Sequence, residues 1–350
     1  MRELFYAALK RYCQSALWFY FSKWQIKDNN KLPSGPIIFV ANHQNAFLDA
    51  VLVSCSIPQP VWSLARAEVF EKPLARKILT WLKMMPVFRF RDGFSTLKKN
   101  DETFSACINR LANGESILIF AEGNHHDHWR LRPLQKGFAR IAIAAEEKNN
   151  WQLGLHIVPI GLQYEHAHES LSRVLVKIGD PIKVATVIDQ TDTLAGQLQD
   201  LVTLTTHRLE PLILNIDEKH YADKVNYLMH YRMKSKDLNE QLAMDRAVLQ
   251  TFDGSENLPP APKRHRFWNP LYTYWFLNTL VPWLLIQWVL KTKMKDPQFT
   301  SSLRFALGMI LVPVFVLIQS FAIGFFFNEW WALLYFISIP VFYKIHSRLV

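Results

Sequence analysis

The sequence is poor in the residues and motifs that mark several common protein classes. Its three cysteines, Cys13, Cys55 and Cys107, lie far apart and form no CxxC pair. This usage indicates neither a disulfide framework nor a zinc site, and it favours a reducing compartment. No P-loop, GxGxxG fingerprint, GxSxG nucleophile elbow or internal repeat is present. We also expect no signal peptide, because Lys10 and Arg11 interrupt the first apolar stretch.

The chain is rich in hydrophobic residues and carries an excess of positive charge. Half of the 350 residues are hydrophobic, a fifth are charged, and the net charge is +10. A mean hydropathy near zero is high for a soluble protein, so we expect some apolar surface to meet lipid. The excess of Lys and Arg favours an anionic partner: a membrane surface, a phosphorylated substrate or nucleic acid. Because the charge adjoins apolar runs, we favour lipid headgroups and expect no nucleic acid.

Short apolar runs alternate with helical patterns between about Gly35 and Ile182. Strands are expected over 36–41, 61–65, 86–90, 116–122, 155–164 and 173–179, with helices over 67–85 and 101–114 between them. This alternation predicts an α/β sandwich whose central sheet is mainly parallel or mixed and is flanked by helices. Pro159, within the fifth run, predicts an edge strand or the end of a strand.

The flanking regions differ in composition from this α/β domain, which we place at 31–185. Residues 1–30 predict an amphipathic helix on a membrane, since apolar residues recur from Phe5 to Trp24 at three- to four-residue spacing. The alternative is a helix packed on the core of its own domain. Residues 186–252 read as a helical extension of two or three helices, and the proline-rich stretch 253–268 reads as a linker.

The C-terminal part, 269–350, predicts apolar membrane helices. Two runs, 269–290 and 305–327, contain enough apolar residues to cross a bilayer, while 330–343 is short for a full span. Basic residues flank the hairpin 305–343 on both sides, which places both of its ends in the cytoplasm. Basic residues also flank 269–290, so we expect that run to be re-entrant or interfacial. A buried helical hairpin in a soluble fold is the alternative.

An imidazole and a carboxylate follow the first strand of the α/β domain, in the stretch VANHQNAFLDA. His43 can act as a base near neutral pH, and Asp49 could hold its tautomer and stabilise the imidazolium that forms. No serine nucleophile accompanies the pair, so the chemistry indicated is direct activation of a substrate hydroxyl. The alternative is that His43 caps the next helix and Asp49 is a surface residue.

Two further strand ends carry polar groups. Arg89 and Arg91, in MPVFRFRDG, suit a phosphate that two guanidiniums can grip, although they could also be surface arginines. Glu122 and Gly123 end another strand, where glycine allows a close backbone approach. The histidines at 125, 126 and 128 favour a polar loop over a metal site, because adjacent positions do not converge easily on one ion.

Four ordered blocks over roughly 36–182, NHQNAFLD, MPVFRFR, FAEG and IVPIG, resemble the membrane-bound glycerolipid acyltransferase family of the lysophosphatidate acyltransferase type. The tail KDPQFTSSLRF and the apolar runs after it look like the glycerol-3-phosphate and dihydroxyacetone-phosphate acyltransferase branch. Five residues separate His43 from Asp49, one more than the family pattern. Either a bulge or an altered helix start absorbs the extra residue, or Asp49 is not the orienting group and Asn45 takes a weaker share. Ala121 replaces the usual proline, which we expect to be tolerated.

The resemblance implies an O-acyltransferase of phosphatidate synthesis. His43 would act as the base and Asp49 would orient it, while an acyl group passes from acyl-CoA or acyl-carrier protein to glycerol-3-phosphate or 1-acylglycerol-3-phosphate. The acceptor phosphate would bind Arg91, helped by Arg89. Glu122 with Gly123 would shape the same site.

The same resemblance implies no cofactor and no metal, with the acyl donor as a co-substrate. Membrane lipids, the donor and the phosphorylated acceptor are the expected partners. We expect a membrane location with the catalytic domain facing the cytoplasm. The competing interpretation is a non-catalytic lipid-binding or membrane scaffold protein with the same fold.

Overall fold

The computed structural model describes residues 1–28, 32–87, 96–254, 258–260, 269–294 and 299–349. The strands are β1 (Lys23–Lys27), β2 (Ile37–Ala41), β3 (Val61–Arg66), β4 (Met84–Val87), β5 (Ser116–Phe120), β6 (His156–Tyr164), β7 (Arg173–Ile178) and β8 (Ile182–Lys183). The helices are α1 (Arg2–Tyr20), α2 (Ala46–Ser56), α3 (Pro73–Trp81), α4 (Thr96–Ala112), α5 (Gly137–Lys148), α6 (Val184–Val187), α7 (Leu194–Leu209), α8 (Tyr221–Tyr231), α9 (Leu238–Gln250), α10 (Pro270–Asn278), α11 (Leu280–Lys293), α12 (Thr300–Phe326) and α13 (Glu329–Leu349), with 3₁₀ turns at Ala67–Phe70 and Glu210–Leu212.

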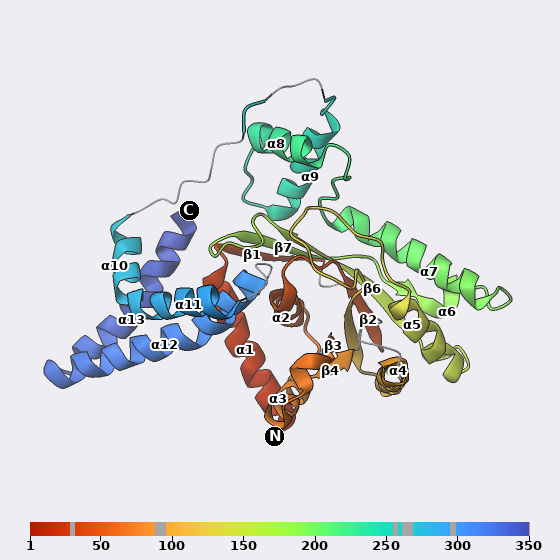
Figure 1. Ribbon diagram of the computed structural model, residues 1–350, viewed down its shortest axis with the longest axis horizontal. Helices are drawn as coiled ribbons and strands as arrows, with labels where there is room; N and C mark the ends of the chain where they lie inside the picture. The colour runs from red at the N-terminus through yellow and green to blue at the C-terminus, as the bar shows by residue number, and fades with distance from the viewer. Residues whose placement is uncertain (29–31, 88–95, 255–257, 261–268, 295–298, 350) are drawn as a thin grey trace.

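The strands form one mixed sheet in the order β1-β7-β6-β2-β5-β3-β4, with β8 also paired to β6 (Figure 1). The run from β6 to β4 is parallel throughout. β7 is antiparallel to β6, and β1 is parallel to β7. The predicted α/β class with a mainly parallel or mixed sheet is therefore confirmed.

β2 lies at the centre of the sheet and all five of its residues are buried. Its side chains alternate between two cores, as the two-residue period of a strand requires. Ile38 and Val40 pack in a cluster that includes residues of α5 and α7. Ile37, Phe39 and Ala41 pack on the opposite side, in a cluster that includes residues of α1, α2 and α12. The sheet is thus covered on both faces, and β2 positions whatever follows it at the sheet's edge.

The structure contains the expected strands, and it differs from the prediction near the two edges of the sheet. The N-terminal helix ends at Tyr20, so Trp24 lies in the edge strand β1 and not on the helix. β1 and β8 were not predicted, because each is short and gains its stability by pairing with a distant strand. β4 begins at Met84, earlier than expected, and residues 88–90 of that predicted strand lie outside the described residues.

The prediction that Pro159 marks an edge strand or a strand end is wrong. It lies inside β6, between β2 on one side and β7 and β8 on the other. The carbonyl of Pro159 accepts a hydrogen bond from Gly179, in the gap between β7 and β8. The nitrogen of Pro159, which carries no hydrogen, faces this same gap between β7 and β8. No strand there could accept a hydrogen bond from it, so the proline costs the sheet no hydrogen bond.

Helix α1 has one packed face and one exposed face. Leu17 and the following Phe21 are buried in the cluster on the α2 side of the sheet. Leu4, Phe5 and Trp18 are exposed. One face of α1 thus packs on the core of its own domain, which was the alternative to a helix on a membrane. Contact of the exposed face with a membrane stays a prediction.

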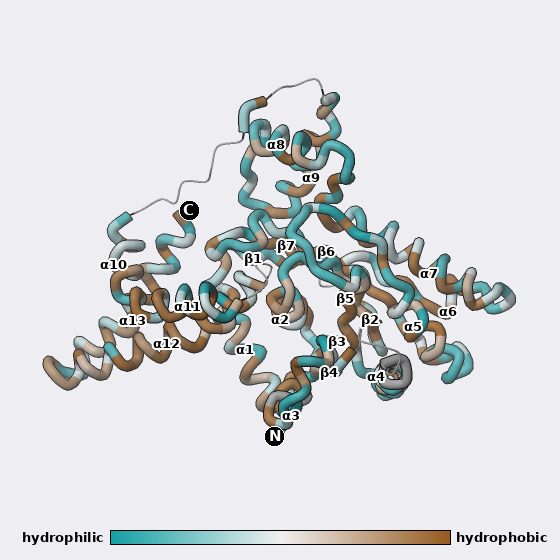
Figure 2. Tube along the Cα trace, in the orientation of Figure 1, coloured by the Kyte–Doolittle hydropathy of each residue, from teal (hydrophilic) through white to brown (hydrophobic). Residues whose placement is uncertain are grey.

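The C-terminal part forms a group of apolar helices beside the sheet (Figure 2). The first run, 269–290, is broken at Thr279 into α10 and α11. Within the described ranges, α12 is the one helix whose length and composition suffice to cross a membrane. The third run continues beyond 343, because α13 extends to Leu349.

The end of α13 is fastened to α1. Lys344 Nζ donates hydrogen bonds to the main-chain carbonyls of Trp18, at 2.5 Å, and Phe21, at 3.3 Å. The same ammonium lies 4.2 Å from the centre of the Trp18 ring. These contacts satisfy carbonyls at the C-terminal end of α1, which have no partner within the helix.

A largely buried carboxylate, Glu165, ties α8 and α9 to the sheet. Glu165, just after β6, accepts a hydrogen bond of 2.9 Å from Arg173 of β7 and lies 3.4 Å from Arg232, which follows α8. Arg232 also pairs with Asp245 of α9 at 2.7 Å. Burial alone would raise the pKa of Glu165, but the hydrogen bonds and charges of the two arginines lower it to about 2.

We expect Glu165→Gln to remove an acid-sensitive part of the stability. A lowered pKa means that the carboxylate stabilises the fold above its ordinary pKa of 4.5, and that this stabilisation fades as the pH falls toward 2. The variant should lose roughly 2–3 kcal/mol of unfolding free energy at pH 7 and progressively less in acid. Thermal unfolding between pH 7 and pH 3 measures the gap, with Glu218→Gln, at an exposed carboxylate, as the control. A gap that is independent of pH would contradict the prediction.

Candidate functional site

Two neighbouring parallel strands end side by side at the site. Ala41, the last residue of β2, lies opposite Phe120, the last residue of β5, so His43 and Glu122 each follow by two positions. The main-chain N–H of His43 donates to Glu122 Oε1 at 3.0 Å, and that of His126 donates to the His43 carbonyl at 3.1 Å. These bonds hold both segments at the carboxyl edge of the sheet, where open α/β sheets bind ligands.

The structure brings His43 and Asp49 into direct contact. His43 Nδ1 lies 2.8 Å from Asp49 Oδ2. The same oxygen accepts the main-chain N–H groups of Gln44 and Asn45, both at 2.7 Å. The extra residue in the spacing is absorbed at the start of α2, where Ala46 has a φ of 40°. The altered helix start thus preserves the pair, and Asn45 contributes its backbone to Asp49.

Asp49 is fully buried, and Tyr164 completes its set of donors. The Tyr164 hydroxyl, at the end of β6, donates to Asp49 Oδ1 at 2.6 Å. Burial and the charge of Asp49 raise the pKa of Tyr164 well above its ordinary value, so the phenol remains a neutral donor. Asn42 exchanges two hydrogen bonds with the backbone of Leu162, which holds β6 beside the site. Sequence reasoning missed Tyr164, because no local pattern relates it to Asp49.

The His43 ring is held on two sides and reaches the surface. It stacks on Phe120 with centroids 4.2 Å apart, and His125 meets it edge-on at 5.3 Å. Its side chain is 15% exposed. Among the described residues, none donates to or accepts from Nε2. With Nδ1 bound to a carboxylate, Nε2 is the nitrogen that can take a proton from a bound molecule.

The Glu122 side chain makes its contacts with other residues of the protein. Its side chain is buried, and Oε2 lies 3.1 Å from His126 Nε2 and 4.0 Å from Arg132 Nε. Arg132 also donates to the Glu122 carbonyl at 3.3 Å. Gly123 has a φ of 75°, a left-handed conformation that favours glycine. This turn therefore shapes the site by holding His43 and Arg132.

The predicted phosphate ligands Arg89 and Arg91 lie outside the described residues, so their role stays a prediction. Arg132 is a guanidinium that the structure places at the site, about a third exposed. Arg130 pairs with Glu218 at 2.8 Å instead.

The three histidines of the loop after β5 do not converge. In the part of the chain that the structure describes, no three His, Cys, Asp or Glu side chains are grouped to hold a metal ion. The rings have different neighbours: His43 and Phe299 for His125, Glu122 for His126, and Tyr221 for His128.

The start of α12 reaches the loop that carries His43. Ser302 Oγ donates to the Asn45 carbonyl at 2.9 Å and accepts the Leu48 N–H at 3.0 Å. Ser301 Oγ donates to Asn45 Oδ1. Both serines are buried. Sequence reasoning missed this clamp, formed by Ser301 and Ser302, because 256 residues separate Asn45 from Ser301.

Comparison with known proteins defines the class of the α/β part. Residues 23–163 match the Acyltransferase family model. The match spans β1 to β6 and includes His43, Asp49 and Glu122. This part of the chain is an acyltransferase-family domain, which confirms the resemblance drawn from its four motif blocks.

Parts of the chain are also similar to individual proteins. Glycerol-3-phosphate O-acyltransferase 1 of Saccharomyces cerevisiae is 40% identical over 74 residues, which are 21% of this chain and 10% of the yeast protein. The chloroplastic 1-acyl-sn-glycerol-3-phosphate acyltransferase BAT2 of Brassica napus is 28% identical over 146 residues, 41% of this chain and 38% of that protein. The crystal structure of the LPA acyltransferase PlsC from Thermotoga maritima aligns with a TM-score of 0.42 and 16% identity, over 59% of this chain and 80% of its own. The aligned residues thus cover about a tenth of the yeast protein and well under half of the Brassica protein.

Replacing Asp49 by asparagine should destabilise the fold. An asparagine can keep its oxygen toward His43 and the two main-chain amides, but its NH₂ group then faces Tyr164, whose hydroxyl must turn from donor to acceptor. The variant also loses the charge that strengthens all four buried hydrogen bonds. We expect the free energy of unfolding to fall by about 3 kcal/mol. Thermal unfolding compares this variant with Asp127→Asn, which changes an exposed carboxylate in the neighbouring loop. A loss no larger than that of the control would show that Asp49 does not organise the site.

Ser302→Ala should loosen the loop that carries His43. The variant loses one hydrogen bond to Asn45 and one from Leu48, so hydrogen exchange over residues 43–50 should accelerate by about tenfold. Ser320→Ala is the matched control, since that buried serine of α12 donates to the Val316 carbonyl of its own helix, at 2.7 Å, and bonds no other helix or loop that the structure describes. Equal exchange in the two variants would rule out the clamp.

Proposed function

We propose that the protein is a glycerolipid O-acyltransferase that transfers a fatty acyl group from a thioester donor to glycerol-3-phosphate or 1-acylglycerol-3-phosphate. The observation that carries the proposal is the buried Asp49 carboxylate, 2.8 Å from Nδ1 of a surface-reaching His43. The acyltransferase-family domain and its glycerol-3-phosphate and 1-acylglycerol-3-phosphate acyltransferase relatives support the same reaction class. Acyl-CoA and acyl-carrier protein are the candidate donors, and no cofactor enters the scheme.

In this proposal His43 acts as the general base. Its Nε2 takes the proton of the acceptor hydroxyl while that oxygen attacks the thioester carbonyl carbon. The carbon–sulfur bond then breaks, and the leaving thiolate receives the proton from the imidazolium. Asp49 keeps the proton of the resting ring on Nδ1 and stabilises the imidazolium between the two steps. Burial raises the pKa of Cys55 and Cys107 to about 12, so neither buried thiol supplies a competing thiolate.

The acceptor phosphate needs cations beside this base. We assign Arg89 and Arg91 to that role because two guanidiniums can hold phosphate oxygens in bidentate fashion. Arg132 adds positive charge at the same edge, held by Glu122. Glu122 and Gly123 then act on the substrate indirectly, by fixing the turn that presents His43 and Arg132.

The other regions of the chain are consistent with an enzyme that acts at a membrane surface. We propose that 31–185 forms the catalytic domain facing the cytoplasm, that 186–252 is a helical extension, and that 253–268 is a linker. The regions 1–30 and 269–350 would attach the protein to the bilayer. Large apolar side chains exposed on α12, such as Phe321 and Phe325, support lipid contact. A membrane location suits a reaction whose product partitions into the bilayer.

His43→Ala should abolish acyl transfer and leave the fold intact. Loss of a general base costs a factor of about 10²–10⁴ in rate. Purified protein would be assayed with labelled acyl-CoA or acyl-carrier protein and with each of the two acceptors. His128→Ala is the matched control, because that imidazole lies in the adjacent loop and is largely exposed.

Two outcomes would count against this proposal. Retained transfer in His43→Ala would remove the base from the mechanism. Absence of transfer by the wild-type protein with every donor and acceptor pair would favour the lipid-binding scaffold instead.

A further inference from the structure

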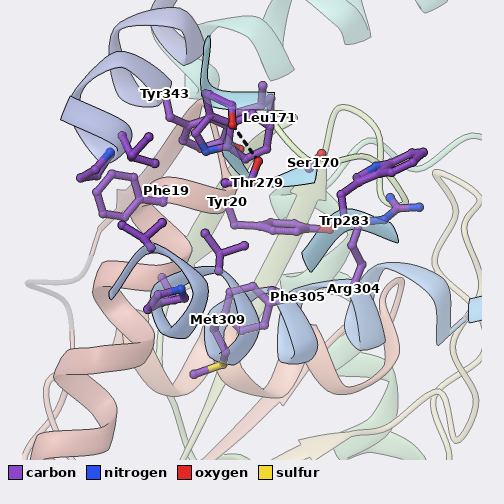
Figure 3. Close-up of a pocket in the computed structure, with 18 of the residues that line it drawn as sticks. Phe19, Tyr20, Ser170, Leu171, Thr279, Trp283, Arg304, Phe305, Met309 and Tyr343 are labelled. Atoms are coloured by element: carbon purple, nitrogen blue, oxygen red, sulfur yellow. Dashed lines mark hydrogen bonds between the residues drawn. The ribbon is translucent and has the colours of Figure 1, made fainter. Parts of the chain in front are cut away.

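A cavity of about 700 Å³ lies between α1 and the helices α10–α13, and His43 is not among the described residues that line it. Its volume is that of a small-molecule site. Figure 3 shows Phe19 and Tyr20 of α1 facing Phe305 and Met309 of α12, with Trp283 and Arg304 toward one edge. The wall is mostly aromatic and aliphatic, which suits a hydrocarbon chain better than a polar ligand.

Positive charge gathers at one end of this cavity. Arg304 lies in the second turn of α12 and donates one hydrogen bond to the His168 carbonyl at 3.1 Å. Lys291 and Lys293 are exposed in the last turn of α11. α11 and α12 are joined by six residues and pack against each other, so these three cations share one end of the helix pair. Arg304 lines the cavity and the two lysines lie at the same end of the helix pair, and such a set of cations suits a lipid phosphate at a membrane surface.

We propose that this cavity binds one acyl chain of an anionic bilayer phospholipid, with the lipid phosphate at Arg304. The hydrocarbon lies among the aromatic side chains, and Lys291 and Lys293 attract the negative headgroup. The site is separate from the acceptor site at His43. Among the described helices, α12 has the length and composition to cross a membrane, so bilayer lipid would be an abundant ligand for a cavity that α12 lines.

The bound lipid would also support the catalytic loop. Arg304 follows the clamp serines Ser301 and Ser302 within the first two turns of α12. A lipid that fills the cavity fixes this end of α12, and thereby fixes Asn45 and the start of α2 through the clamp. Anionic phospholipid should therefore activate acyl transfer. This second half of the inference rests on the proposed function, whereas lipid binding does not.

Gly308 offers a way to fill the cavity. It lines the wall, and a Cβ built on it meets no atom within 4 Å. Gly308→Phe therefore places a ring in the cavity without a backbone clash, and Gly308→Ala is the matched control. Arg304→Gln removes the charge that faces the phosphate, and Arg304→Lys keeps a charge there.

The binding experiment uses the full chain in detergent, with phosphatidylglycerol or phosphatidylcholine added and retained lipid counted by native mass spectrometry. Wild-type protein and Gly308→Ala should keep one phosphatidylglycerol. Gly308→Phe should lose retention by about tenfold or more, and Arg304→Gln by about fivefold, with Arg304→Lys between it and wild type. Thermal unfolding confirms folding, and Arg304→Gln carries the test if Gly308→Phe does not fold.

Three results would overturn the inference. One is undiminished retention in Gly308→Phe and Arg304→Gln, and another is equal retention of both phospholipids. The third is competitive displacement by 1-acylglycerol-3-phosphate, which would assign the cavity to a substrate chain.

The activity experiment measures initial rates in mixed micelles of detergent and phosphatidylcholine as the fraction of phosphatidylglycerol rises. Wild type and Gly308→Ala should be activated severalfold in kcat with KM for the acceptor unchanged, and Gly308→Phe should not respond. Equal activation of Gly308→Phe would refute the coupling. Failure of the proposed function would appear differently, as no transfer by wild type under any condition while selective lipid retention persists.

Discussion

The carboxylate of Asp49 is the interaction on which the site depends. It is buried, and its two oxygens collect donors from His43, from two main-chain amides and from Tyr164. A buried charge is tolerable only when its hydrogen bonds are satisfied, so these donors must stay where they are. The end of β2, the start of α2 and the end of β6 are consequently held together around one residue. The position of the His43 ring follows from that constraint.

The apolar helices belong to the same structural unit as this site. Ser301 and Ser302 bond the loop between β2 and α2, and Phe299 packs against His125. Phe305 is buried among side chains of α1 and the sheet. The start of α12 is therefore part of the scaffold around His43, while its distal part carries large exposed apolar side chains. A helix suited to lipid contact and a loop suited to chemistry are joined by a few buried hydrogen bonds.

Much of the fold was predictable because its causes are local. The six predicted strands are short, mostly apolar runs, and parallel strands that end together place His43 beside Glu122 without further information. β1 and β8 escaped prediction because pairing with β7 and β6, not local pattern, makes them strands. The place of Pro159 inside the sheet also depends on a gap between two distant partners.

The site was predictable only in part, for the same reason. His43, Asp49 and Glu122 stand in recognisable blocks of sequence, but the spacing alone left the pairing of His43 with Asp49 open. It is settled by the unusual backbone at Ala46, which tertiary contacts impose. Tyr164 and the clamp serines act across more than a hundred residues, and no periodicity or composition marks them.

The contact of Lys344 with α1 bears on how the chain matures. The ammonium bonds a carbonyl of Trp18 across 326 positions of sequence. A ribosome makes α1 long before it makes this lysine, so α1 has no such partner while the intervening residues are synthesised. Closing so long a loop is entropically slow. During that interval the apolar surface of α1 is open to chaperones or to the bilayer, and Lys344 can bond α1 only after the intervening residues have been made.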